Sequence, residues 1–113
     1  MEFKDIVKYH RNAPKTKLDR HPDIQKAYDN DKTTEKELRS RLFNNNQVWV
    51  LTENKYPYYF IDNTKHYVMW FDKKINYTLI NFLLREYDQI VYFENIQQCK
   101  SIKSIPHVHI FIK

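Results

Sequence analysis

The stretch His107-Val-His-Ile-Phe-Ile112 decides which sheet this chain can build. Side chains alternate along a strand, so three aliphatic residues share one face and two histidines share the other with a phenylalanine. The first face holds Val108, Ile110 and Ile112, and the second holds His107, His109 and Phe111. An imidazole can donate, accept, carry a proton near neutral pH, bind a metal or attack phosphorus. This strand is therefore predicted to carry part of the core and a candidate site.

Composition predicts one folded domain. The chain has 113 residues, of which 42% are hydrophobic and 16% aromatic, enough for a single core and too few for a second one. It contains no glycine. Glycine-rich phosphate loops of the Walker and Rossmann types need torsions that only glycine adopts easily, so both are excluded.

Charge and cysteine content narrow the partners and the compartment. The net charge is +5 with scattered lysines, which permits a small anionic ligand but gives no clear nucleic-acid signal. The single cysteine, Cys99, allows no internal disulfide and fits a reducing compartment. No apolar run approaches membrane-spanning length, and the start does not have the form of a signal peptide. We expect a protein without a membrane partner, cytoplasmic or otherwise intracellular, whose cofactor and oligomeric state remain unknown.

The N-terminal half is predicted to be helical. Residues 1–17 are interpreted as a flexible basic arm with a short helical turn around Phe3–Tyr9, and residues 18–113 as a single α+β domain. A helix is expected from Pro22, because proline suits a first turn. A second helix is expected after Thr34, which forms a capping box with Glu37.

The C-terminal half is predicted to be mostly strands. We expect strands at 47–52, 66–71, 89–94 and 107–112, and a long loop over 95–106. A helix capped by Asp72 or Asn76 should run through Tyr87. Its buried stripe would comprise Leu79, Ile80, Leu83, Leu84 and Tyr87. The fold class is therefore α+β: N-terminal helices, then a mainly antiparallel sheet of about four strands with one intervening helix.

Polar residues stand near the ends of three predicted strands. His66 opens the second strand, Asn95 follows the third, and His107 opens the fourth. Antiparallel neighbours bring such ends together. We expect His66, Asn95, His107 and His109 to line one cleft.

Several short motifs, in the same order and spacing, are shared with a known family. They are Leu18-x-Arg20-x-Pro22 with Tyr28, Leu51-x-x-Asn54-x-Tyr56-Pro57-Tyr58, His66-x-x-x-Trp70, Tyr92-Phe93-x-Asn95 and Lys100-Ser101-Ile102-x-x-Ile105-x-His107-x-His109. From Leu18 onward the chain thereby resembles the fungal N-acetylglucosamine-induced protein family, whose domain has no known function. Tyr59 stands where that family usually has a glycine.

The C-terminal strand also resembles the histidine-triad motif (His-φ-His-φ-His-φ-φ) of nucleotide hydrolases and transferases. That resemblance implies phosphate-ester or nucleotidyl chemistry on a nucleotide or sugar phosphate, with His109 as nucleophile and His107 as its partner. Asn95 and either Ser101 or Ser104 would hydrogen-bond the phosphate. The third histidine is absent, because Phe111 takes its place.

Two alternatives remain open, and so does the question whether the chain is an enzyme. The histidines could form a metal site with a water or Glu94 as fourth ligand. The protein ligands would be His66, His107 and His109. The phosphate-ester chemistry described above requires no metal. Alternatively, the chain is a non-catalytic binding or structural module. The candidate ligand-binding residues are Asn54, Tyr58, His66, Asn95, Lys100 and Ser101.

Overall fold

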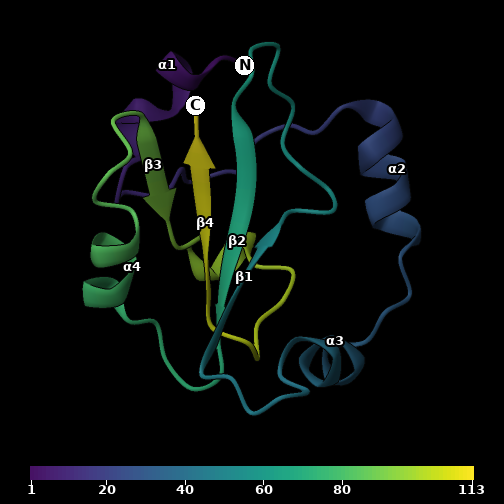
Figure 1. Ribbon diagram of the computed structural model, residues 1–113. Coiled ribbons are helices and arrows are strands. Elements are labelled where there is room, and N and C mark those ends of the chain that lie inside the picture. Colours follow the sequence, from purple (N-terminus) through teal and green to yellow (C-terminus); the bar gives the residue numbers. More distant parts are fainter.

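The computed structural model describes residues 1–113, and it has two layers of helix and loop around one antiparallel sheet (Figure 1). The elements follow the order α1 (Phe3–Ile6), the 3-10 turn η1 (Val7–Tyr9), α2 (Pro22–Asn30), α3 (Glu35–Leu42), β1 (Trp49–Glu53), β2 (Lys65–Phe71), α4 (Tyr77–Leu83), β3 (Ile90–Phe93), the 3-10 turn η2 (Gln97–Cys99) and β4 (His107–Ile112). The strands are ordered β1-β2-β4-β3. The predicted α+β class is confirmed. None of the helices has the length and apolar character needed to cross a bilayer.

The helices begin where the sequence supplies a cap. Pro22 is in the first turn of α2, and the His21 side chain accepts a hydrogen bond from the Asp23 N–H. Thr34 caps α3 by accepting from the Glu37 N–H. Asn76, one of the two predicted caps, accepts from the Leu79 N–H at the start of α4. These side chains satisfy amide groups that have no partner within the helix.

The helix α4 is shorter than predicted. It ends at Leu83, and Tyr87 is 50% exposed, so Tyr87 is not part of the buried stripe. Of the expected stripe, Ile80 and Leu84 are buried, and Leu79 and Leu83 pack partly against the core. The physical reason is that the chain turns away before one more helical turn could bring Tyr87 back to the sheet.

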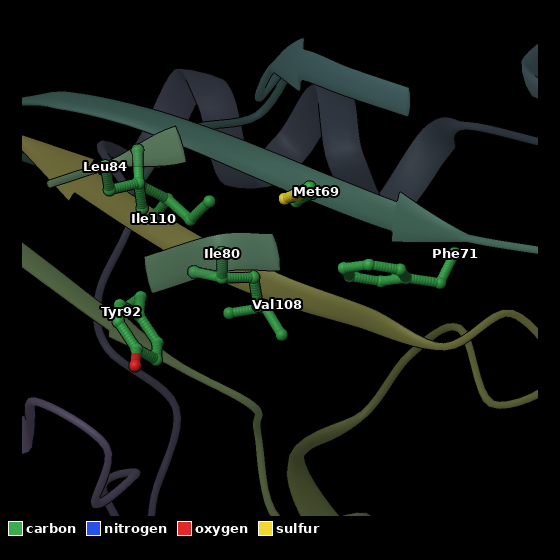
Figure 2. Close-up of a cluster of buried hydrophobic side chains, with 7 residues drawn as sticks. All are labelled: Met69, Phe71, Ile80, Leu84, Tyr92, Val108 and Ile110. Carbon is green, nitrogen blue, oxygen red and sulfur yellow. The ribbon is translucent and has the colours of Figure 1, made fainter. Parts of the chain in front are cut away.

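One face of the sheet packs against α4 and forms an aliphatic and aromatic core (Figure 2). Its seven buried residues come from β2, β3, β4 and the α4 segment: Met69, Phe71, Ile80, Leu84, Tyr92, Val108 and Ile110. Figure 2 shows the side chains of Ile80 and Val108 meeting between helix and strand. The aliphatic face predicted for residues 107–112 is thus the face covered by α4.

The opposite face is covered by the N-terminal segment and by loops. A second buried cluster joins Phe3 and Ile6 to Tyr58 and to residues of β3 and β4. The helical turn expected near Phe3–Tyr9 is present as α1 and η1. Since Phe3 and Ile6 are 8% and 0% exposed, these two side chains belong to the core, although they lie in the segment interpreted as a flexible arm. The division of the chain at residue 18 stays a prediction.

Candidate functional site

Two buried histidines lie in contact on the face of the sheet away from α4. His66 on β2 and His109 on β4 are 2% and 6% exposed. Their positions are diagonal neighbours, because Val68 is the residue directly opposite His109. Nε2 of His66 lies 2.8 Å from Nδ1 of His109. The structure therefore joins two imidazoles that are 43 residues apart.

The backbone fixes the direction of the hydrogen bond between these rings. The N–H of Tyr58 donates to Nδ1 of His66 at 3.1 Å, and a backbone N–H can only donate. A neutral imidazole that accepts at Nδ1 carries its proton on Nε2. His66 therefore donates from Nε2 to Nδ1 of His109, and His109 must carry its own proton on Nε2.

Asn95 accepts the hydrogen bond that Nε2–H of His109 donates. Its side-chain amide lies 3.1 Å from Nε2 of His109 and 3.4 Å from the Tyr58 hydroxyl. A half-turn of the amide places its oxygen toward Nε2, where it accepts from the His109 ring and also from the Tyr58 hydroxyl. The result is one directed chain from the Tyr58 backbone through His66 and His109 to Asn95.

Asn54 supports the loop that holds His66. Its Oδ1 accepts from the Tyr56 N–H at 2.8 Å, so its amide nitrogen faces Nε2 of His66 at 3.2 Å. Since Nε2 carries the proton, this second approach is a packing contact and not a hydrogen bond. The hydrogen bond from the Tyr56 N–H to the Asn54 side chain closes a turn, which is a role that Asn commonly has at the start of a loop.

Both buried imidazoles are neutral. Burial is the main cause that lowers the pKa of His66 well below its usual value, and repulsion that its protonated form would meet from His109 and then from Arg20 adds to this effect. Burial is also the main cause that lowers the pKa of His109 to about 3, with contributions from His107, Arg20 and Lys17. A buried cation without a carboxylate partner is strongly unfavourable. His109 is enclosed, because loops and the N-terminal segment cover the face of the strand on which it lies.

His107 differs from the other two histidines because one of its nitrogens is free. Its Nδ1 lies 2.8 Å from the Ile105 carbonyl oxygen, which can only accept, so the proton is on Nδ1. Nε2 makes no hydrogen bond, and it is not fully enclosed, because the Thr64 hydroxyl is the only fully enclosed side-chain nitrogen or oxygen without a partner. Nε2 of His107 is therefore an unpaired lone pair with slight solvent contact, in a residue that is 6% exposed. Burial is the main cause that lowers the pKa of this ring.

An aromatic residue and a charged pair flank His107. The Trp70 ring centroid lies 4.8 Å from that of His107, and the Trp70 Nε1–H donates to the Thr52 hydroxyl. Lys100 forms an ion pair with Glu94. Lys100 is close enough for its charge to lower the pKa of His107, and that of Glu94 to raise it. A partly exposed tryptophan next to a free imidazole can hold a planar group.

Further cations gather beside this cluster. Nε of Arg20 donates to the Tyr56 carbonyl at 2.7 Å, and its guanidinium lies over the rings of Tyr28 and Tyr58 at 4.1 and 5.0 Å. Lys17 donates to the Ser101 hydroxyl at 2.6 Å, and the Tyr28 hydroxyl also bonds to Ser101. The positive charges come from one short segment, residues 17–20, and from the loop after β3.

The predicted site residues divide into two groups. The first comprises Tyr58, His66, Asn95 and His109, which form the buried hydrogen-bonded cluster, and the partly buried Asn54, which packs against His66. In the second group, His107 lies beside that cluster, with its ring 5.6 Å from that of His109. Lys100 is paired with Glu94, and Ser101 is exposed and bound to Lys17 and Tyr28. Ser104 bonds to Glu35 on α3 instead of facing the histidines.

Two further observations bear on the alternatives. No group of three or more His, Cys, Asp or Glu side chains is arranged to hold a metal ion. The facing nitrogens of His66 and His109 are hydrogen-bonded to each other. An open cavity of about 250 Å³ borders His66 and the loop at Pro57, but it does not reach Asn95, His107 or His109. A second cavity, of about 220 Å³, is lined by Arg11, Tyr77 and Glu94 among others. The four residues expected to line one cleft thus share a face, but neither cavity joins them.

Lys17 and Tyr28 were not among the predicted site residues. Tyr28 stands in the first of the motifs shared with the known family. Its spacing from Arg20 in that motif could therefore have identified it as a site residue. Lys17 had none, because it is one of many scattered lysines. The Ile105 carbonyl, which sets the tautomer of His107, carries no side-chain signal at all.

The comparisons with known proteins bear on the family. Residues 72–113, which hold α4, β3 and β4, match the family profile described as "Protein of unknown function (DUF3605)". N-acetylglucosamine-induced protein 1 of Candida albicans is 32% identical over 94 aligned positions, which take in 64% of this chain. The predicted family resemblance is confirmed. The chain spans 37% of the length of this N-acetylglucosamine-induced protein, whose name states an inducer and not a reaction.

A solved structure is similar in fold. "Crystal Structure of HTC1" superposes with a TM-score of 0.66 at 14% identity, over 84% of this chain and 75% of that one. At that identity the likeness concerns the fold alone. The resemblance to N-acetylglucosamine-induced proteins thus supplies a family of unknown function, and the chemistry must be argued from the site.

Proposed function

We propose that the chain binds a small phosphate ester beside His107 and that Nε2 of His107 attacks its phosphorus. The observation that carries this proposal is the free Nε2 lone pair on a ring whose Nδ1–H is fixed by the Ile105 carbonyl. A nucleophilic imidazole needs an unprotonated nitrogen that is not already hydrogen-bonded. His109 has none, because both its nitrogens are engaged, whereas His107, which is equally buried at 6% exposure, keeps Nε2 unpaired.

Burial supports the same role. Because the pKa of His107 is lowered, the ring is neutral at physiological pH, and only the neutral ring has a lone pair to use. The nearby ammonium group of Lys100 can attract an anionic ligand and stabilise charge on the equatorial phosphate oxygens. The Trp70 ring next to His107 can hold a planar base or a sugar face.

The proposed reaction balances as a two-step hydrolysis. The Nε2 lone pair forms a bond to phosphorus as the bond from phosphorus to the leaving oxygen breaks, and the leaving alkoxide takes a proton from water. A second water then attacks phosphorus, the bond from phosphorus to Nε2 breaks with its electron pair returning to Nε2, and the proton that this water loses neutralises the hydroxide left by the first step. The net products are an alcohol and a phosphate. In this scheme His66, His109 and Asn95 position the strand, and none of them reacts.

The test compares two histidine variants. The wild type is assayed on phosphomonoesters, phosphodiesters and nucleoside polyphosphates, and the protein is analysed for an acid-labile phosphohistidine. His107→Gln should lose at least about 100-fold in turnover, the range for loss of an acting imidazole, together with the phosphohistidine. His21→Gln, which removes a histidine outside the cluster, should change neither.

Two results would overturn the proposal. Full turnover by His107→Gln, or a phosphate recovered on His109, would remove His107 from the chemistry. Failure of the wild type to turn over any member of the panel would leave a non-catalytic module, in which the buried hydrogen-bonded chain serves only to fix the core.

A further inference from the structure

The two edge strands of the sheet, β3 and β1, differ in whether another segment hydrogen-bonds to their outer side. At the β3 edge, the Arg11 N–H donates to the Tyr92 carbonyl and the Tyr92 N–H donates to the His10 ring. The N-terminal segment therefore closes that edge. The β1 edge is not closed in this way, since no other segment makes a hydrogen bond to its outer side.

The register tells which groups of β1 point outward. The Asp72 N–H donates to the Val48 carbonyl, and the Asn54 N–H donates to the His66 carbonyl. Hydrogen-bonded pairs alternate along an antiparallel ladder, so the even-numbered residues of β1 bond to β2. The N–H and C=O groups of Trp49, Leu51 and Glu53 therefore face away from the sheet without a partner.

This edge has little of the usual protection. Edge strands are commonly blocked by lysine, proline or a bulge, and β1 contains none of these, its one charged residue being Glu53 at its end. Leu51, at the centre of β1, is 43% exposed, and Val48, just before the strand, is 72% exposed. A strand with free backbone groups and an exposed apolar centre is suited to pairing with another strand.

We propose that β1 pairs antiparallel with β1 of a second copy of this chain, with Leu51 opposite Leu51 on the two-fold axis. In that register Trp49 lies opposite Glu53, and the outward groups of all three residues meet their partners. Each pair exchanges two N–H···O bonds. The two sheets join into one continuous sheet.

Side-chain chemistry favours this occupant and this register. Val50 lies opposite Thr52, a pair of β-branched residues that stabilises a ladder. No like charges face each other, since Glu53 meets Trp49 and Lys55 meets Gln47. A register centred on Glu53 would oppose two carboxylates and leave the Trp49 groups unpaired. Self-pairing about Leu51 therefore uses the whole edge without electrostatic cost.

The test is a charge swap at the axis, measured by sedimentation at about 100 µM, where a contact with a Kd near 10 µM is mostly formed. The wild type should have twice the 14.0 kDa mass of one chain. Leu51→Lys and Leu51→Glu should each be monomeric, because like charges meet on the axis. An equimolar mixture of the two should be dimeric again. Phe82→Lys, at a position on α4 that is even more exposed than Leu51, should remain a dimer.

Three results would overturn this inference. They are a monomeric wild type at that concentration, a dimer that persists in Leu51→Lys, and charge-swapped chains that fail to recombine. A monomeric wild type whose Leu51 environment changes only on adding an extended peptide would assign the edge to another protein. Because Leu51 lies on the α4 face of the sheet and His107 on the other, the outcome is independent of the catalytic proposal.

Discussion

Among single residues, the buried pair His66 and His109 should make the free energy of unfolding depend on pH. In the folded state the pKa of His109 is about 3 and that of His66 is well below 6.5. In the unfolded chain both rings titrate near 6.5. Below that pH the unfolded state binds more protons than the folded state, so the free energy of unfolding falls as the pH falls.

The first prediction follows from this difference. Between pH 7 and pH 5 the wild type should lose about 2 kcal/mol of stability through His109, and the lowered pKa of His66 should add to the loss in the same direction. His109→Gln should start less stable at pH 7 by roughly 1–3 kcal/mol, since it disturbs a buried hydrogen-bonded chain, and should show a shallower loss over the same interval. Urea titrations at several pH values measure both. Parallel pH profiles for the two proteins would show that His109 does not titrate on unfolding.

The sequence predicts the position of a site residue where the side chain itself is distinctive. Strand-end convergence predicted one cleft lined by His66, Asn95, His107 and His109, and the structure brings His66, His109 and Asn95 into contact, although neither cavity joins the four residues. The division of roles among the histidines could not be predicted. It depends on the Tyr58 N–H and the Ile105 carbonyl, which every residue possesses, and on loops whose path no periodicity encodes.

At the scale of elements, the ends of helices were more predictable when a capping side chain was present. The starts of α3 and α4 follow from Thr34 and Asn76. The end of α4 did not, because the chain has no glycine to mark it. The strand β4 matches its predicted range, since its alternation is unbroken from His107 to Ile112.

The helix α4 gives the prediction at this scale. Asn76→Ala removes the side-chain oxygen that accepts from the Leu79 N–H, and it should lower the free energy of unfolding by about 1 kcal/mol. Asn76→Asp should keep most of the stability, because a carboxylate accepts the same bond and interacts favourably with the helix N-terminus. Thermal melts of the two variants measure this. If Ala and Asp were equally destabilising, the Asn76 side chain would not be capping the helix.

At the scale of the whole molecule, the sheet is covered by different means on its two faces. The helix α4 covers one face with aliphatic residues from a single element. The other face needs contributions from α1, from Tyr58 and from the loop after β3. Composition predicted one core for 113 residues, but it could not show that the first six residues complete it, because so short an apolar pattern is not distinctive.

The last prediction tests whether that N-terminal segment is structural. Ile6 is fully buried against the second cluster, and the same segment closes the β3 edge through His10 and Arg11. Ile6→Ala should therefore lower the free energy of unfolding by about 2–5 kcal/mol, as for other buried aliphatic truncations. Val7→Ala, at the adjacent exposed position, should change it by less than about 0.5 kcal/mol. Chemical denaturation of both variants gives the comparison. A silent Ile6→Ala would mean that residues 1–17 form a loose arm in solution. A loss confined to Ile6 would instead make the first turn of the chain part of the scaffold that encloses His66 and His109.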